Sequence, residues 1–361
     1  MFMKFVYQYI SMPGYYRIWF LLLCSSISLQ GLDGQASILR REIGEIIRYE
    51  AGIDFSIVPG ILVGVMDGDS IYMSSYGDKL SPDSIYELGS LTKPIVAWLT
   101  DRALDSLGWS KEVSVCRFLP DSLCEGNWSN LSVGQVLAHR SGLPRVGKGI
   151  GESESKIEDP YVDYDLIHLA DDLVEMAPIP GKYSYSQMAY ALLSWLFQKV
   201  GGIESFTQYN LIDPLGLEKT GWAFGDEQIA QGHGLDGRVQ PPWHFDAMLP
   251  AMGLKSSMND LLKILKFISP QLILHTPPLS PSLRKELKAL DKAGEYLVID
   301  GWFAIQSGDD LIFYHTGRTG GHQVSIAFLP EKEKGVVVIS NGALGSNELS
   351  FLVLNMVNNA K

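Results

Sequence analysis

The sequence predicts an α+β fold, in which an antiparallel sheet is flanked by N- and C-terminal helices and a helical subdomain is inserted between two parts of the sheet. Three observations predict it: a hairpin pattern lies within residues 36–85, mainly helical patterns fill residues 86–285, and strand patterns return in residues 286–361. Apolar faces of strands and helices must be buried against one another, so the two end parts are expected to share one sheet. We therefore expect a single domain over residues 35–361.

The composition is typical of a globular protein with a large core. The chain has 361 residues, of which 46% are hydrophobic and 19% are charged. Its formal net charge is −12, and no cluster of basic residues is present. A protein that binds nucleic acid needs a basic surface. The sequence therefore predicts no nucleic-acid partner.

The first 34 residues resemble an export segment rather than part of the fold. Lys4 and Arg17 precede the apolar run Ile18–Cys24, which is too short to span a bilayer comfortably but is typical of a secretory signal. We expect a periplasmic or secreted protein, with contact to a membrane only through this segment. An uncleaved anchor is one alternative. A lipoprotein attached through Cys24 is another, although a small residue usually precedes such a cysteine.

The N-terminal part of the domain predicts a helix followed by two strands. Residues 36–51 carry apolar side chains at helical spacing with charged residues between them, which indicates an amphipathic helix. Residues 60–66 and 70–76 are strand-like and flank Asp-Gly-Asp at 67–69, a strong hairpin signal.

The middle of the chain predicts helices joined by loops. Residues 131–139 form a short helix that ends before Ser-Gly-Leu-Pro, and residues 186–200 are apolar enough for a core helix. Ser257 opens a further helix with the pattern of a capping box. The acidic passage 152–165 is either a solvated loop or a lid over a site.

The C-terminal part predicts an antiparallel meander and a closing helix. Its segments are rich in β-branched and aromatic residues and are separated by turns that contain glycine or charged residues. The predicted strands are residues 296–306, 311–315, 323–328 and 335–339, and the helix is residues 349–357.

Cysteine and histidine spacing predicts no metal centre. Cys116 and Cys124 are the two cysteines in the body of the chain, and they either form a short disulfide or remain thiols. Neither is close to a group of histidines with the spacing of metal ligands. We interpret the histidines at 139, 168, 233, 244, 275 and 322 as structural, and we expect no cofactor.

Ser90 and Lys93 have the spacing of a nucleophile and its base. Residues three apart on a helix lie about 5–6 Å apart, so the amine can reach the hydroxyl and take its proton. Gly89 precedes the pair and the apolar run 95–99 follows it, which places Ser90 at the first turn of a buried helix with free N–H groups. The same spacing recurs at Ser153/Lys156 and Ser282/Lys285, but neither pair begins a buried helix.

Two further stretches contain candidate site residues. Residues 180–187 place Tyr185 and Gln187 on a turn before the core helix. Residues 315–321 follow a strand and are rich in glycine, and Gly317 would let the backbone approach a ligand closely.

Together with Ser90-Leu91-Thr92-Lys93, these stretches resemble the three signatures of the serine β-lactamase and penicillin-binding-protein superfamily, on its class C and low-molecular-weight D,D-peptidase side. Residues 137–144, 215–222 and 251–257 resemble further passages of that family in the same order. The resemblance covers nearly all of residues 35–361, and it implies a β-lactamase/transpeptidase-like catalytic domain.

The resemblance implies a role for each site residue. Ser90 would be the nucleophile, and Lys93 would keep its hydroxyl deprotonatable. Tyr185 would be the general base and then protonate the leaving group, with its pKa lowered by the nearby ammonium. The N–H groups of Ser90 and Arg318 would form the oxyanion hole. Thr316 would bind a substrate carboxylate, while the strand around Gly317 pairs with substrate backbone.

Two positions depart from the family pattern. Gln187 stands where an asparagine is usual, and the extra methylene moves its amide by about 1.5 Å. This puts efficient β-lactam turnover in doubt. His315 replaces the lysine of the third signature, so we expect attraction of a carboxylate to be weaker and to depend on pH near neutrality.

The sequence thus predicts an exported serine hydrolase that acts through a Ser90 acyl-enzyme on amide bonds of D-amino-acid peptides or β-lactams. Its partner would be a small-molecule or peptide substrate, and peptidoglycan is one candidate. Two alternatives stay open: a carboxylesterase of the same fold, and a catalytically weak homologue that binds the cell wall or a partner protein.

Overall fold

The computed structural model describes residues 32–148, 150, 158–276, 280–345 and 347–359. The predicted export segment lies outside the described residues except for its last three positions, and most of the acidic passage before residue 158 also lies outside them. Among the helices that the structure describes, none is both long and apolar enough to cross a membrane.

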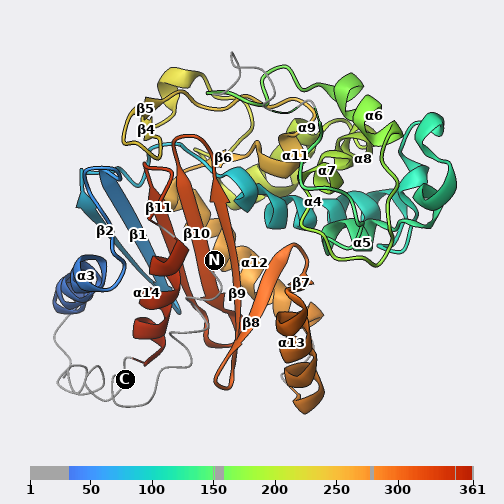
Figure 1. The fold of residues 1–361 in the computed structure, drawn as a ribbon. Coiled ribbons are helices and arrows are strands. Elements are labelled where there is room, and N and C mark those ends of the chain that lie inside the picture. The colour runs from blue at the N-terminus through green and yellow to red at the C-terminus, as the bar shows by residue number, and fades with distance from the viewer. Residues whose placement is uncertain (1–31, 149, 151–157, 277–279, 346, 360–361) are drawn as a thin grey trace.

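The main sheet has seven antiparallel strands in the order β2-β1-β11-β10-β9-β8-β7 (Figure 1). Their bounds are β1 Gly60–Asp67, β2 Ser70–Gly77, β7 Leu297–Ile299, β8 Trp302–Ser307, β9 Asp310–Arg318, β10 Gln323–Leu329 and β11 Lys334–Ser340. The predicted hairpin and the predicted meander are both confirmed, except that residues 296–306, expected as one strand, form β7 and β8 with a turn between them. β1 pairs with β11, so the two ends of the domain share one sheet, as the fold class requires.

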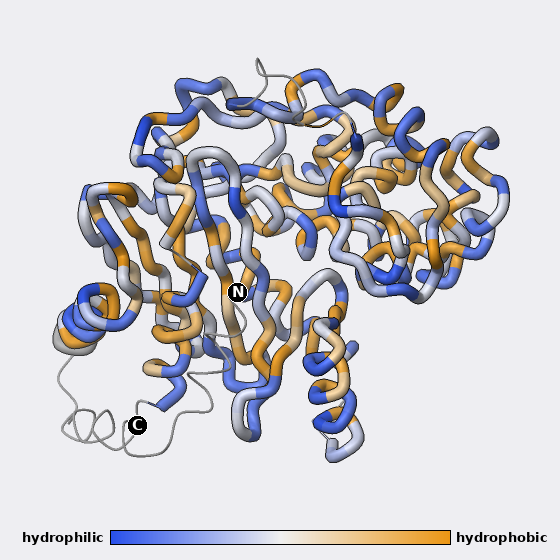
Figure 2. Tube along the Cα trace, viewed as in Figure 1, coloured by the Kyte–Doolittle hydropathy of each residue, from blue (hydrophilic) through white to orange (hydrophobic). Residues whose placement is uncertain are grey.

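Helices cover both faces of this sheet. α3 (Leu32–Tyr49) and α14 (Asn347–Asn359) lie on one face, and α12 (Met258–His275) lies on the other (Figure 1). Alternate side chains of β1 enter the two cores: Val63 packs on the side of α3 and α14, and Leu62 packs on the side of α12. This explains why β1 is apolar along its whole length rather than alternating (Figure 2).

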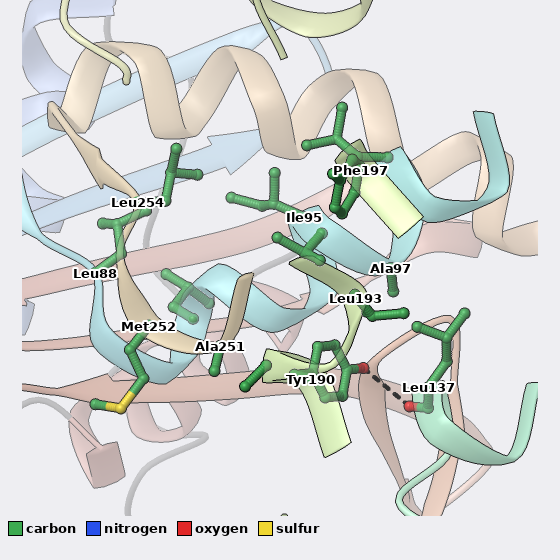
Figure 3. Close-up of a cluster of buried hydrophobic side chains, with 14 of the residues drawn as sticks. Leu88, Ile95, Ala97, Leu137, Tyr190, Leu193, Phe197, Ala251, Met252 and Leu254 are labelled. Carbon is green, nitrogen blue, oxygen red and sulfur yellow. Dashed lines mark hydrogen bonds between the residues drawn. The ribbon is translucent and has the colours of Figure 1, made fainter. Parts of the chain in front are cut away.

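The helical part is built around α4 (Thr92–Leu107), which is buried along most of its length. The helices around it are α5 Val133–Leu137, α6 Leu166–Val174, α7 Gln187–Ala191, α8 Leu193–Gln198, α9 Ile203–Thr207, α10 Asp213–Leu215 and α11 Leu249–Met252. α4, α7, α8 and α11 meet in one apolar cluster, within which the Tyr190 hydroxyl donates a hydrogen bond to the Leu137 carbonyl at 2.9 Å (Figure 3). The helix predicted over 186–200 is therefore two short helices that meet at Leu192.

Some short elements were not predicted. Two small sheets pair β3 (Tyr86–Glu87) with β6 (Lys255–Ser256), and β4 (Gly232–His233) with β5 (Val239–Gln240). Strands of two residues carry no periodicity that a sequence can reveal. Helix α13 (Pro281–Ala293), which is capped by Ser280 and buries Leu283 and Leu287, was also missed.

Two smaller expectations are resolved by local contacts. Cys116 and Cys124 form a disulfide with a Cα–Cα distance of 5.4 Å, so the bridge is the alternative that the structure favours. Ser257 caps α12 by accepting a hydrogen bond from the Asp260 N–H. The second bond of a capping box, from the backbone N–H of Ser257 to the Asp260 side chain, is not formed. The Asp260 carboxylate instead accepts from Lys219 N and Thr220 Oγ1.

Candidate active site

Ser90 lies in a single turn of 3-10 helix, η1 (Gly89–Leu91), that leads directly into α4. The first hydrogen bond of the turn runs from Leu91 N–H to Leu88 O at 3.1 Å. The N–H of Ser90 precedes that bond, as expected for the start of a helix. Ser90 keeps 9% of its surface exposed. The predicted position at the first turn of a buried helix is confirmed.

Strand β9 runs against this turn at a distance that only glycine permits. A Cβ atom on Gly317 would lie 1.8 Å from the Leu88 carbonyl oxygen and 2.7 Å from Leu91 N. Gly89 has a φ of +50°, and a Cβ atom there would lie 2.6 Å from the Arg318 carbonyl oxygen. These contacts bring the backbone of residues 317 and 318 beside Ser90, which is the arrangement that a shared oxyanion hole needs.

Lys93 is fully buried and its amine faces Ser90. Its Nζ lies 3.2 Å from Ser90 Oγ and donates to the Ala251 carbonyl at 2.8 Å. Burial lowers the pKa of Lys93 well below its ordinary value, and the positive charge of Arg145 lowers it further. An amine whose pKa is lowered in this way can accept a proton near neutrality.

Tyr185 shares a side-chain hydrogen bond with Ser90, and the centre of its ring lies 5.3 Å from Lys93 Nζ. Burial raises the pKa of the phenol to about 12, although Ser90 and Arg145 act in the opposite direction. The expectation that a nearby ammonium lowers this pKa is therefore wrong, because the loss of hydration outweighs the charge. Tyr185 is a neutral phenol at pH 7, whereas the neighbouring Tyr183 packs against Tyr296.

Gln187 is buried at the start of α7, and both its backbone and its side chain form hydrogen bonds. Its backbone N–H donates to the Arg145 carbonyl at 2.9 Å. Its side-chain Oε1 accepts from the Tyr161 hydroxyl at 3.0 Å. The oxygen of the amide that a family asparagine would offer to a substrate or to the lysine is thus engaged with a tyrosine.

His315 is buried in β9 with 1% of its surface exposed. Its Nδ1 donates to the Thr316 carbonyl at 2.9 Å, and its ring stacks on Phe303 with centres 5.1 Å apart. Burial, together with Lys93, lowers the pKa of His315 to about 3. The expectation of a partly charged histidine at neutral pH is wrong, since the ring is neutral throughout that range.

The part of β9 that carries the third signature has an open edge. The pairing of β8 with β9 ends at Tyr314, and residues 315–318 pair only with β10. Thr316 lies in this section and is half-buried. An extended substrate backbone could add to this edge as another strand, which is the recognition mode that the resemblance implies.

His139 is a site residue that sequence reasoning missed. Its ring centre lies 4.4 Å from that of Tyr185, and its Nδ1 accepts from Ser186 N–H at 3.3 Å. Burial lowers its pKa well below the ordinary value, with Lys93 and His315 adding to the effect. His139 lies in the passage 137–144, which resembles the family, but nothing in that passage showed that its ring would contact a tyrosine 46 positions later.

Glu87 was also missed, and it anchors the turn of Ser90 to the end of β9. Its carboxylate accepts from Thr319 Oγ1 at 2.8 Å and His322 Nδ1 at 3.1 Å, and from the backbone N–H of Trp243 at 2.7 Å. Burial raises the pKa of this carboxyl, but the hydrogen bonds from His322, Trp243 and Thr319 bring it below the ordinary value. The Glu87 network therefore fixes Arg318 relative to Ser90.

Among the residues that the structure describes, one group of side chains has the spacing of metal ligands, and it lies apart from the candidate site. It consists of Asp101, His275 and Asp300. The Lys111 ammonium pairs with Asp101 at 2.9 Å and also with Asp300, so the place of a cation is already filled. These residues do not fit a metal ion.

Comparisons with known proteins identify the family and the fold. The family model described as Beta-lactamase matches residues 53–350. Unguisins hydrolase ungD of Aspergillus violaceofuscus is 23% identical over 350 residues, which cover 80% of this chain and 59% of that protein. A second unguisins hydrolase, from Aspergillus campestris, is 24% identical and has 40% of its length covered. The chain spans about half the length of these curated relatives.

Solved structures share the fold. The beta-lactamase/D-alanine carboxypeptidase of Yersinia pestis has a TM-score of 0.69 at 21% identity, over 91% of this chain and 100% of that one. A class C beta-lactamase from Rhodobacter sphaeroides has a TM-score of 0.67 at 22% identity, over 90% and 98%. The predicted α+β fold with an antiparallel sheet is confirmed.

Proposed function

This chain belongs to the beta-lactamase family of serine hydrolases, and we propose that it hydrolyses amide bonds through an acyl-enzyme on Ser90. The observation that carries the proposal is the 3.2 Å contact between Ser90 Oγ and a buried Lys93 amine whose pKa is well below its ordinary value. A neutral amine at this distance can take the hydroxyl proton as the oxygen attacks a carbonyl carbon.

The first half-reaction follows from the protonation states. Ser90 Oγ bonds to the carbonyl carbon, its proton passes to Lys93, and the carbonyl oxygen becomes an oxyanion beside the N–H groups of Ser90 and Arg318. Tyr185 is a neutral phenol that shares a hydrogen bond with Ser90. It donates its proton to the leaving nitrogen as the carbon–nitrogen bond breaks. Lys93 then returns a proton to Tyr185, and the acyl group remains on Ser90 as an ester.

The second half-reaction uses the same groups with water in place of the leaving amine. Lys93 accepts a proton from water as the water oxygen attacks the ester carbon. The bond to Ser90 Oγ breaks, the proton returns to Ser90, and a carboxylic acid is released. Because Thr316 and the open edge of β9 would bind an extended chain, D-amino-acid peptides, peptidoglycan among them, and β-lactams remain the proposed substrates.

Ester hydrolysis is a second candidate, and one observation favours it. His315 is neutral and buried, and the Gln187 amide is engaged by Tyr161. His315 and Gln187, which would bind the carboxylate and the amide of a peptide, are therefore expected to bind them weakly. The chemistry at Ser90 does not depend on either residue. A simple ester requires neither group.

Turnover of matched substrates separates these possibilities. Purified protein and Ser90→Ala would be compared on D-alanyl-D-alanine peptides, nitrocefin and p-nitrophenyl esters. Turnover of peptide or nitrocefin that is lost in Ser90→Ala supports the amidase, and turnover of esters alone supports the esterase. If neither substrate class is hydrolysed above Ser90→Ala, the chain is the catalytically weak homologue and the proposal fails.

Export is part of the proposal. The Cys116–Cys124 disulfide supports it, because such bridges persist in oxidising compartments outside the cytosol. Intact-mass measurement of protein recovered from outside the cytoplasm would show an N-terminus near residue 34 if a signal is removed. Retention of the full chain in the cytoplasm would contradict export.

A further inference from the structure

Arg145 places an exposed positive charge directly on the candidate site. It lies in the loop between α5 and α6, and its guanidinium carbon is 5.3 Å from the centre of the Tyr185 ring. Its backbone carbonyl is bound by the N–H of Gln187 at 2.9 Å, which fixes the loop beside α7. Within the described ranges no carboxylate forms an ion pair with Arg145.

The groups around Arg145 leave its charge uncompensated. Tyr185 is a neutral phenol, and His315 is neutral above a pKa of about 3. A guanidinium stays charged at every physiological pH and presents donors that match a carboxylate.

Arg145 supplies a positive charge to the site, whereas the third signature has lost its lysine at residue 315. His315 replaces a lysine and is buried, so β9 offers no side-chain cation at residue 315. Arg145 provides a cation from a different element, next to Tyr185 and Gln187. Arg318, the other exposed arginine at the site, follows the signature on β9.

We propose that Arg145 is a specificity-determining residue that binds a carboxylate carried by the substrate. The inference rests on the proposed Ser90 hydrolase and adds a substrate class to it, namely anionic rather than neutral acyl compounds. Arg145 would act through a charge-assisted hydrogen bond in a partly exposed position, so the selectivity should weaken as ionic strength rises.

Two pairs of esters test the proposal. In the first pair the acyl group carries the charge: mono-p-nitrophenyl glutarate against p-nitrophenyl pentanoate. In the second pair the leaving group carries it: acetyl-3-hydroxybenzoate against phenyl acetate. The measured quantity is the ratio of kcat/KM for the anionic ester to kcat/KM for the neutral ester, in wild type, Arg145→Gln and Arg145→Lys.

Arg145→Gln should lower this ratio about tenfold in at least one pair. The charge of Arg145 also acts on Lys93, but a change in the reactivity of Ser90 affects both esters of a pair and cancels in the ratio. Arg145→Lys should restore part of the ratio because it retains the charge. Lys148→Gln is the matched control, since Lys148 is exposed in the same loop and pairs with Glu175. It should leave the ratio unchanged.

The inference is overturned if wild type and Arg145→Gln discriminate equally in both pairs, or if Arg318→Gln removes the selectivity and Arg145→Gln does not. Failure of the proposed function gives a different result. In that case hydrolysis by wild type would not exceed that of Ser90→Ala for any of the four esters.

Discussion

Gly317 lies so close to Leu88 that a Cβ atom added to it would stand 1.8 Å from the Leu88 carbonyl oxygen. Leu88 immediately precedes the turn that carries Ser90, so this contact sets the distance between β9 and the proposed nucleophile. The two segments are far apart in the sequence, and their packing depends on the absence of one methyl group.

Gly317→Ala should therefore separate β9 from the turn of Ser90. We expect a loss of about 1–3 kcal/mol in the free energy of unfolding, because the clash is with backbone and no flexible side chain can give way. Modification of Ser90 by a fluorophosphonate should slow at least tenfold. Gly134→Ala is the matched control, since its Cβ would meet nothing closer than 3.4 Å. Equal stability and labelling in the two variants would contradict this account.

Lys93→Met should abolish turnover without loss of stability. The variant keeps the volume of the side chain but removes a fully buried amine whose desolvation disfavours its charge. We expect the free energy of unfolding, measured in urea, to stay within about 1 kcal/mol of wild type, because the loss of the hydrogen bonds to Ser90 and Ala251 is offset by removal of the desolvation cost. Turnover should fall by about 10³-fold or more. Activity retained in the folded variant would show that Lys93 is not the base.

Tyr185→Phe tests the proton donor. The substitution keeps the ring that His139 contacts at 4.4 Å and removes only the hydroxyl. Acylation by an amide should slow by about 10²–10⁴-fold. Acylation by a p-nitrophenyl ester should slow much less, because that leaving group needs no proton. An equal loss for both substrates would assign Tyr185 a different role, such as positioning Ser90.

His315 should make the protein less stable in acid. Its pKa is about 3 in the folded protein, whereas an unfolded chain takes up the proton near pH 6.5. The unfolded state thus binds more protons between these values, so stability falls as the pH falls through this window. His315→Phe, which keeps the stack on Phe303, should reduce the slope of stability against pH by up to about 1.4 kcal/mol per pH unit. An unchanged slope between pH 4 and 6 would contradict a buried neutral histidine.

Much of the fold was predictable because its signals are local. The hairpin of β1 and β2 follows from two apolar runs around Asp-Gly-Asp, and η1 with α4 follows from Gly89 and the apolar residues after Lys93. Helix α13 was missed although its signals are local too: Ser280 caps it, and Leu283, Leu287 and Leu290 recur at helical spacing. The prolines at 277, 278 and 281 outweighed this spacing in the prediction, although a proline at the first helical position is compatible with a helix.

The proximity of the candidate site residues was predictable from the sequence, but their pKa shifts were not. Ser90, Lys93 and Tyr185 were identified from their patterns, and the structure brings them together. The direction of the pKa shift at Tyr185 was not predicted, because it depends on burial of the ring among Lys93, His139 and Phe303, which no local pattern reports. Arg145 and His139 were missed for the same reason, since their contacts with Tyr185 cross about 40 residues of sequence.

The central claim is that Ser90 is the residue acylated. The most direct measurement is to treat the purified protein with a fluorescent penicillin and, separately, with a fluorophosphonate, digest it, and locate each adduct by mass spectrometry. We predict an adduct on the peptide that contains Ser90 and none in Ser90→Ala. An adduct on another serine, or equal labelling of Ser90→Ala, would contradict the mechanism.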